Sequence, residues 1–349
     1  MQAPTDIVET LTWLVDIPSE TGNEDEICSA VAARLDGLPT KRVKESLVVG
    51  QPGDRPLIVL AGHLDTVPRQ GQDAASILDG RLWGLGAADM KAGVAAMIHL
   101  LEDPEVMEGP YNVVGVFYAG EEGPFDGNQL ADVLEGVPFL SEASCAVVLE
   151  PSDGELQHGC NGAINATATF RGSSSHSARP WWGENAISKA GEWLAKMHRL
   201  EPIDYEVDGL VFRQVATVTT AEGGVARNVI PGEFRCNVNL RYTPDKTVAE
   251  AIGDLEGLCE EADLLEVEDV APAGSVDANH PFLVSLAEES GAPRAAKQGW
   301  TDVARFSEIG VPAVNYGPGE TSRAHQVDES VPLDQLSTVW DSLRSALTS

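Results

Sequence analysis

Four short, mostly apolar segments, each followed closely by charged or imidazole side chains, constrain this sequence more than any other feature. The segments are Leu57–Ala61, Val113–Tyr118, Ala146–Leu149 and Pro312–Tyr316. Short apolar runs without alternation are typical of strands that are buried on both faces. Helix-like segments separate these runs, and strands that alternate with helices predict a mainly parallel α/β sheet covered by helices on both faces.

The pattern changes in the middle of the chain. Ala163–Phe170, Val215–Thr220 and Phe234–Tyr242 alternate apolar and polar residues, as half-exposed strands do, and the helical segments Asn185–Leu200 and Thr247–Ala262 lie among them. We therefore expect an α+β domain with a four-stranded antiparallel sheet and two helices, inserted into the α/β domain. The predicted boundaries are residues 1–162, 163–271 and 272–349.

Composition excludes several partners. The chain has 55 Asp+Glu against 23 Lys+Arg, a formal charge of −32, which argues against nucleic acids and anionic membranes because both are polyanions. No uninterrupted apolar stretch approaches the ~18 residues of a transmembrane helix. The five cysteines are odd in number and widely spaced, and the first residues do not resemble a signal peptide. Reduced thiols and a cytoplasmic location are expected.

Candidate chemical groups follow the predicted buried strands. His63, the Glu121–Glu122 pair and Glu150 each come at or just after a strand end. The carboxyl ends of parallel strands line one crevice of an open sheet, where ligands bind. Asp89 stands at the start of a predicted helix, and His325 lies in a Gly/Pro-rich loop after the last strand.

This set of side chains predicts a metal site. Several carboxylates in one crevice repel each other unless cations join them. Two imidazoles with three carboxylates suit Zn²⁺ or a similar first-row metal, and a shared carboxylate and a shared water would complete two open sites. Asp65, two residues after His63, is expected to accept the second ring N–H of that imidazole.

Two other kinds of site are rejected. Gly84-Leu85-Gly86 lacks the third glycine and the preceding strand of a dinucleotide-binding turn. Ser173–Ser175 does not form the G-x-S-x-G turn of serine hydrolases.

A set of motifs resembles a known family over nearly the whole chain. The motifs are GHLDTVP, GLGAADMKAG, AGEEG, LEPSDG, SSSHSARPWWGENAI, RNVIPGE and the late His325. In this order they resemble the dinuclear-zinc deacylase and exopeptidase family, which includes acetylornithine deacetylases, succinyl-diaminopimelate desuccinylases, aminoacylases and glutamate carboxypeptidases. The segment GWTDVARFSEIGVPAVNYGPGE looks most like the desuccinylases.

The resemblance implies a role for each matching residue. His63 and Glu150 would bind one zinc, Glu122 and His325 the other, and Asp89 would bridge them, with the Asp89–Met90 peptide bond in the cis form. Cobalt can substitute for zinc in such sites. Asp65 would support His63, and Glu121 would be the general base that takes a proton from a metal-bridging water.

The inserted domain resembles the family's lid, which also forms a homodimer. His176 would reach the partner subunit's active site and stabilise the oxyanion. Five further residues are implied as substrate contacts, with Arg179 the loosest match: Arg241, Asn228, Arg179, Gly299 and Thr301. The sequence departs from the family at Trp300, where many relatives carry a small residue, and at Cys160-Asn161, where some carry arginines.

The expected function is a dizinc amide hydrolase that removes succinate from N-succinyl-LL-2,6-diaminopimelate, in diaminopimelate and lysine biosynthesis. Two alternatives stay open. One is another N-acyl amino-acid deacylase, such as an acetylornithine deacetylase, or a carboxypeptidase of the family. The other is a non-catalytic relative that binds amino-acid derivatives, although no ligand and no base is missing from the motifs.

Overall fold

The computed structural model describes residues 6–72 and 74–349 and divides into two compact units. Unit 1 runs to Gly159 and resumes at Ser275–Ala296 and Asp302–Ser349, and unit 2 comprises Cys160–Gly274 and Lys297–Thr301. The predicted insertion, residues 163–271, lies within unit 2. Residues 1–5 lie outside the described residues. They begin the predicted domain segment 1–162, and they include some of the first residues that were compared with a signal peptide.

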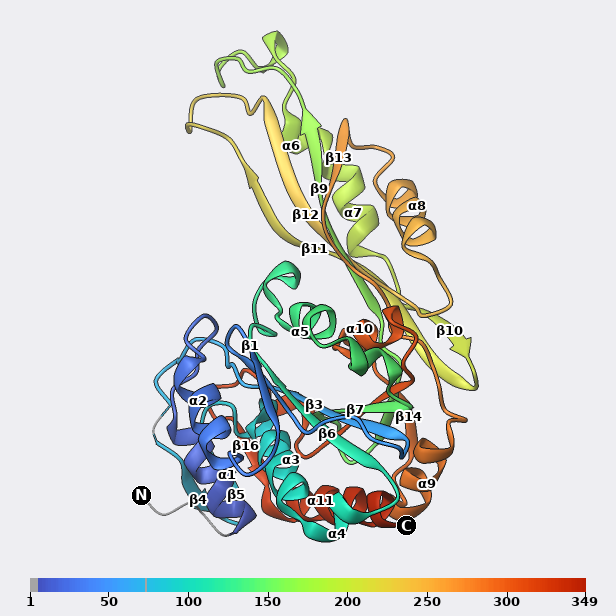
Figure 1. Cartoon of the computed structure of the whole chain (residues 1–349). Helices are drawn as coiled ribbons and strands as arrows, with labels where there is room; N and C mark the ends of the chain where they lie inside the picture. Colours follow the sequence, from blue (N-terminus) through green and yellow to red (C-terminus); the bar gives the residue numbers. More distant parts are fainter. Residues whose placement is uncertain (1–5, 73) are drawn as a thin grey trace. The chain divides into compact units, whose positions relative to one another are not determined.

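An eight-stranded mixed sheet forms the centre of unit 1 (Figure 1). Its strands, in spatial order, are β1 (Thr40–Val43), β2 (Ser46–Val49), β6 (Asn112–Tyr118), β3 (Leu57–His63), β7 (Cys145–Pro151), β15 (Ala313–Gly317), β8 (Leu156–His158) and β14 (Arg294–Ala296). The consecutive strands β6, β3, β7 and β15 are parallel. These four are the predicted buried strands, so the prediction of a mainly parallel sheet is confirmed.

Helices cover both faces of this sheet. On one face lie α1 (Ile7–Asp16), α2 (Asp25–Arg34), α3 (Ala92–Glu102), α4 (Pro104–Glu108), α9 (Pro281–Ser290) and α11 (Leu333–Thr348), and on the other α5 (Leu130–Gly136) and α10 (Val303–Glu308). Alternate strand residues divide between two cores: Ile58 and Leu60 pack with the first group, and Val59 and Ala61 with the second. Both faces of β3 are therefore apolar, which explains its uninterrupted apolar sequence.

A small sheet that the sequence did not predict borders one loop of the candidate site. It pairs β16 (Ser330–Pro332), β5 (Arg81–Trp83) and β4 (Ser76–Leu78) in that order. All three strands are only three residues long, and β4 is exposed throughout, so no apolar pattern marks them. Because Trp83 pairs with Ser330, this sheet places the segment after β5 beside the segment before β16.

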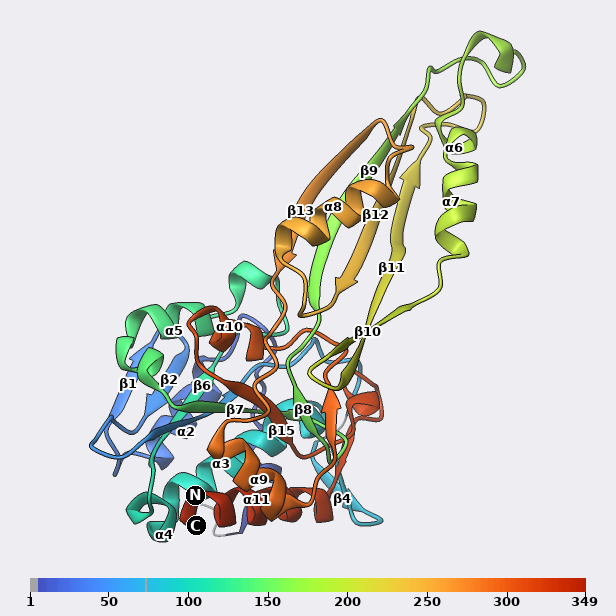
Figure 2. The same ribbon diagram turned by 90° about the vertical axis from the view of Figure 1, so that its right-hand side faces the viewer.

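Unit 2 is an antiparallel sheet with helices packed on one face (Figure 2). Its strands in spatial order are β10 (Ile203–Val207), β11 (Leu210–Gly223), β12 (Glu233–Tyr242), β9 (Gly162–Arg171) and β13 (Leu264–Ala271), and its helices are α6 (Ala186–Lys189), α7 (Gly191–His198) and α8 (Val248–Leu258). Even-numbered residues such as Ile164 and Val238 face the helices, while Asn165 and Asn239 bond to each other on the opposite face.

The predicted count of four strands and two helices in unit 2 is wrong. The sheet has five strands, because β10 and β11 form a hairpin around Asp208-Gly209, both at positive φ. Asp-Gly with φ positive at both residues is the signature of a tight hairpin turn. The predicted helix Asn185–Leu200 is interrupted between α6 and α7, at Ala190.

Across the described ranges 6–72 and 74–349, no helix combines the length and the apolar character that a bilayer crossing requires.

Candidate metal centre

The carboxyl ends of the parallel strands in unit 1 bring the predicted ligands together. His63 is the last residue of β3, and Glu150 is the penultimate residue of the adjacent strand β7. The Nε2 atom of His63 lies 3.1 Å from Oδ1 of Asp89 and 3.6 Å from Oε1 of Glu150. His63, Asp89 and Glu150 can each offer one ligand atom within 4.8 Å of the others.

A second group of three shares Asp89 with the first. Nε2 of His325 lies 2.9 Å from a carboxylate oxygen of Glu122 and 3.5 Å from Oδ2 of Asp89. These three residues also offer ligand atoms within 4.8 Å of one another, as do His63, Glu121 and Glu122. The two oxygens of Asp89 thus face different imidazoles, which is the arrangement that a bridging carboxylate requires.

The backbone around Asp89 is irregular. The segment Ala87–Lys91 is a distorted helical turn in which Asp89 has φ −118°, and the Asp89–Met90 peptide bond is cis, as the resemblance implies. Gly86 before it has φ +77°, and a Cβ there would lie 2.6 Å from Cγ2 of Thr66. Glycine is therefore required at position 86 for both reasons, the left-handed backbone and the lack of space.

Asp65 lies at 0% exposure and acts mainly through main-chain contacts. The ring Nδ1 of His63 is 3.0 Å from the main-chain oxygen of Asp65 and 3.5 Å from its Oδ1, so the main-chain oxygen is the closer acceptor. The two carboxylate oxygens accept hydrogen bonds from the main-chain N–H groups of Glu121 and Glu122, at 3.1 and 3.0 Å. Asp65 therefore fixes both the imidazole tautomer and the turn that carries the two glutamates.

The acid groups strongly influence each other's protonation. Burial, followed by the nearby carboxylates of Glu150, Asp302 and Glu122, raises the pKa of Glu121 well above its ordinary value, against the opposing effect of His63. Hydrogen bonds to Asp89 and Glu122 raise the pKa of His325 to about 10. The clustered carboxylates therefore stabilise a positive charge next to the imidazole rings, whether a proton or a metal ion carries it.

The donor chemistry fits two divalent cations. Each group that contains Asp89 supplies one imidazole nitrogen and two carboxylates, a set that suits Zn²⁺ and related first-row ions. Three protein ligands per ion leave coordination positions for substrate and solvent, as in catalytic sites. Two such ions would supply the positive charge that the clustered carboxylates favour.

Two buried carboxylates near this centre were missed by the sequence analysis. Asp302, at 0% exposure, accepts hydrogen bonds from the amide of Asn128 at both carboxylate oxygens (2.9 and 3.0 Å), and it forms an ion pair with Arg305. Glu329, at 2% exposure, accepts main-chain hydrogen bonds from the loop that leads to Asp89. Neither residue follows an apolar strand, so the strand-end pattern could not reveal them.

The remaining predicted site residues belong to unit 2. Nδ1 of His176 accepts the N–H of Ala178 at 3.0 Å, so the neutral ring carries its proton on Nε2 and can donate from there. Ser177 donates its N–H to the main-chain oxygen of Asn228, which links the His176 loop to the segment before β12. Nε of Arg241 donates to Oδ1 of Asn239 on the polar face of the sheet.

The other three predicted substrate contacts lie in two loops of unit 2. The guanidinium of Arg179 stacks 4.8 Å from the ring of Trp182, in a loop whose Trp181 and Trp182 are exposed. Gly299 and Thr301 belong to the short segment 297–301, and the Trp300 indole between them donates to the main-chain oxygen of Pro272. The departure at Trp300 therefore anchors this segment within unit 2.

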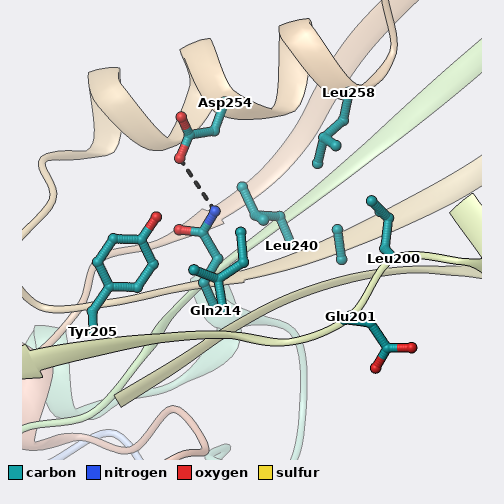
Figure 3. Close-up of a pocket in the computed structure, with 9 residues that line it drawn as sticks. Leu200, Glu201, Tyr205, Gln214, Leu240, Asp254 and Leu258 are labelled. Carbon is teal, nitrogen blue, oxygen red and sulfur yellow. Dashed lines mark hydrogen bonds between the residues drawn. The ribbon is translucent and has the colours of Figure 1, made fainter. Parts of the chain in front are cut away.

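Unit 2 also contains a cavity of about 230 Å³ that holds none of the predicted site residues (Figure 3). Its walls are largely aliphatic, with Leu200, Leu240 and Leu258 among them. Two of its polar residues bond to each other: the Gln214 amide donates to Asp254 at 3.3 Å, and it accepts from Lys246 at 2.8 Å. Such a pocket offers packing and no reactive group.

Three relatives extend over most of the chain. A Mycobacterium tuberculosis protein with the provisional name succinyl-diaminopimelate desuccinylase DapE is 35% identical and covers 98% of both chains. The succinyl-diaminopimelate desuccinylase of Corynebacterium glutamicum is 32% identical, over 96% of this chain and 94% of its own. The acetylornithine deacetylase of Myxococcus xanthus is 31% identical, over 86% and 82%.

Solved structures share the fold. A tripeptidase from Staphylococcus aureus superposes with a TM-score of 0.79 at 23% identity, over 98% of this chain and 97% of its own. The Bacillus subtilis YXEP protein, described as a dinuclear metal binding peptidase, gives a TM-score of 0.71 at 15% identity, over 98% and 96%. The sequence model of peptidase family M20/M25/M40 matches residues 59–349. With relatives above 30% identity along its length, the chain belongs to peptidase family M20/M25/M40.

Proposed function

We propose that this protein is a metal-dependent amide hydrolase that removes succinate from N-succinyl-LL-2,6-diaminopimelate, in diaminopimelate and lysine biosynthesis. The observation that carries the proposal is the pair of His–carboxylate groups that share Asp89, with Glu121 beside them. The desuccinylase names of the two relatives above 31% identity support the choice of substrate.

We assign two Zn²⁺ ions to the centre, which Co²⁺ can replace. His63 and Glu150 would hold one ion, Glu122 and His325 the other, and Asp89 both. When bound, the two ions polarise the amide carbonyl and lower the pKa of a water molecule.

Glu121 is the proposed general base. It takes a proton from the attacking water as the C–O bond forms, and it delivers this proton to the amine as the C–N bond breaks. Burial raises the pKa of Glu121, which brings a carboxylate closer to the range in which it can both accept and return a proton at neutral pH. Asp65 holds the main chain of Glu121 and so orients this base.

We assign substrate recognition and oxyanion stabilisation to unit 2, as the lid. The Nε2–H of His176 is a suitable donor to the developing oxyanion, and it would act in the partner subunit. Arg241 and Arg179 would bind substrate carboxylates, and Asn228, Gly299 and Thr301 would complete the contacts. These roles rest on the family resemblance together with the local geometry of each residue.

A homodimer through unit 2 is consistent with its exposed sheet edge. Residues 215–223 of β11 pair with β12 on one side, and no described strand pairs with their other side. An unpaired strand edge is a ready template for pairing with a second copy. We also propose a cytoplasmic location, because all five cysteines are free and buried, as in proteins of reducing compartments.

The test compares two substrates. The purified protein, supplied with Zn²⁺ or Co²⁺, is assayed with N-succinyl-LL-2,6-diaminopimelate and with N-acetylornithine, and kcat/KM is measured for each. We expect a clear preference for the succinylated substrate. A preference for N-acetylornithine would refute the proposal and favour the alternative, an acetylornithine deacetylase, which the Myxococcus relative supports.

A further inference from the structure

Glu329 is a buried carboxylate outside the proposed ligand set. Its Oε1 accepts the main-chain N–H groups of Ala88 and Asp89 at 2.9 and 3.0 Å, and its Oε2 accepts that of Gly86 at 3.0 Å. The side chain is only 2% exposed. Because both oxygens are occupied by amide donors, Glu329 acts on the centre through the backbone of this loop.

The same residue connects this loop to the turn that carries His325. The main-chain oxygen of Glu329 accepts the N–H of Gly84 at 3.1 Å, and its N–H donates to Gln326 at 3.2 Å. His325 is therefore only one residue from the acceptor of that last bond. The pairing of β5 with β16 continues directly beside the Glu329–Gly84 hydrogen bond, because the neighbouring residues Trp83 and Ser330 are paired.

Glu329 gathers three hydrogen bonds from one loop. When it is ionised, a carboxylate that accepts N–H groups forms charge-assisted bonds, which are stronger than neutral ones. Three such bonds converge on one loop that ends in Asp89. Removal of the acceptor would leave buried N–H groups without a partner, and the loop would adjust to satisfy them.

We propose that Glu329 is a positioning residue for the metal centre: it holds the Asp89 backbone and fixes its separation from His325. This inference rests on the metal centre of the proposed function. The group of Asp89, Glu122 and His325 should depend on Glu329 most, because two of its three members lie on the two segments that Glu329 joins. His63 and Glu150 lie within adjacent sheet strands, so their positions do not depend on this contact.

The main variant is Glu329→Gln, which keeps the size of the side chain but presents an NH₂ group to one of the amide donors. The metal-free protein is titrated with Co²⁺, and each binding step is followed by calorimetry and by the visible absorption of the bound ion. We expect two steps in the wild type. In the variant, one step should weaken about 10- to 100-fold with an altered absorption spectrum, and the other should remain within a few-fold.

Asp328→Asn is the matched control. It removes the same charge from the same turn, but the Asp328 side chain is 64% exposed and pairs with Arg323. We expect wild-type affinities for both steps. Glu329→Asp is a second variant, for use if Glu329→Gln does not fold. It retains the carboxylate, but its side chain is one methylene shorter and cannot reach the same N–H groups, so the same binding step should weaken.

The outcomes separate the two proposals. Two unchanged steps in Glu329→Gln, or an equal loss in both steps with an unchanged spectrum, would overturn the positioning role and leave the metal centre intact. A wild-type protein that binds fewer than two ions would overturn the metal centre itself, and the role of Glu329 with it.

Discussion

Gly93 lies in the first turn of α3, directly against β7, and its replacement by alanine should disturb the metal centre. A Cβ at position 93 would overlap the main-chain oxygen of Leu149, and it would lie 2.8 Å from Cβ of Leu149 and 2.9 Å from Cε of Met90. Leu149 precedes Glu150, and Met90 follows Asp89. The new methyl group would therefore press on both segments that carry proposed ligands.

The size of the effect follows from these contacts. Ordinary carbon–carbon contacts begin near 3.4 Å, so α3 and β7 would have to separate by about 0.5–1 Å. Overpacking of this kind costs about 1–3 kcal/mol of stability. A displacement near 1 Å at a reacting centre can lower turnover by about 100-fold. Gly93→Ala should therefore lower both the melting temperature and kcat.

Gly253→Ala in α8 is the matched control. Gly253 is also a helical glycine, but no atom lies within 4 Å of the position where its Cβ would be. Alanine is favoured over glycine in helices by up to about 1 kcal/mol, so this variant should be slightly more stable and fully active. Thermal unfolding and turnover are measured for both variants. If Gly93→Ala were stabilised like Gly253→Ala, the close approach of α3 to β7 would be disproved.

Three further predictions concern other residues. Glu121→Gln should keep the metal content and lower kcat at least 100-fold, because the general base is lost; metal analysis beside turnover checks this, and retained turnover would contradict it. His176→Ala should lower kcat by about 10²–10³-fold, and mixing it with Glu121→Gln should restore some activity if His176 acts in the partner subunit. Burial holds the pKa of His158 at about 4, so the unfolded chain binds a proton between pH 6.5 and 4 that the folded chain does not. The free energy of unfolding should fall by about 3 kcal/mol as the pH falls through this window. Urea titrations at several pH values should show that His158→Phe abolishes this pH dependence, whereas His198→Phe, at an exposed position, leaves it unchanged.

The central strands could be predicted because burial on both faces leaves a simple trace in the sequence. β3 packs Ile58 and Val59 into different cores, so every residue must be apolar, and its last residue, His63, stands out at the strand end. The small sheet of β4, β5 and β16 leaves no such trace, because its strands are short and partly exposed. The hairpin of β10 and β11 carried a readable Asp208-Gly209 signal that the sequence analysis did not use.

The proposed ligands could be recognised in the sequence more readily than the residues that support them. A ligand must place its side chain in the crevice, so it sits at a strand end or a loop tip and can be recognised by position. Asp65 was recognised from its position two residues after His63, but its bonds to main-chain N–H groups were not, and neither was Glu329, because such donors are present at every residue except proline. No residue pattern can indicate which amides will converge on a carboxylate, since that depends on how distant segments fold together.

The use of carboxylates as supports also bears on the charge of −32. Asp65 and Glu329 place two more carboxyl groups behind a centre that already gathers Asp89, Glu122 and Glu150. The amide donors stabilise these supporting carboxylates locally, and no lysine or arginine in the described part of the chain forms an ion pair with Asp65 or Asp89. The supporting carboxylates therefore add to the attraction for divalent cations. Under the proposed function, the substrate has three carboxylates and one ammonium group. The proposed metal ions and the proposed substrate-binding arginines, such as Arg241, would then have to attract it against the field of the protein as a whole.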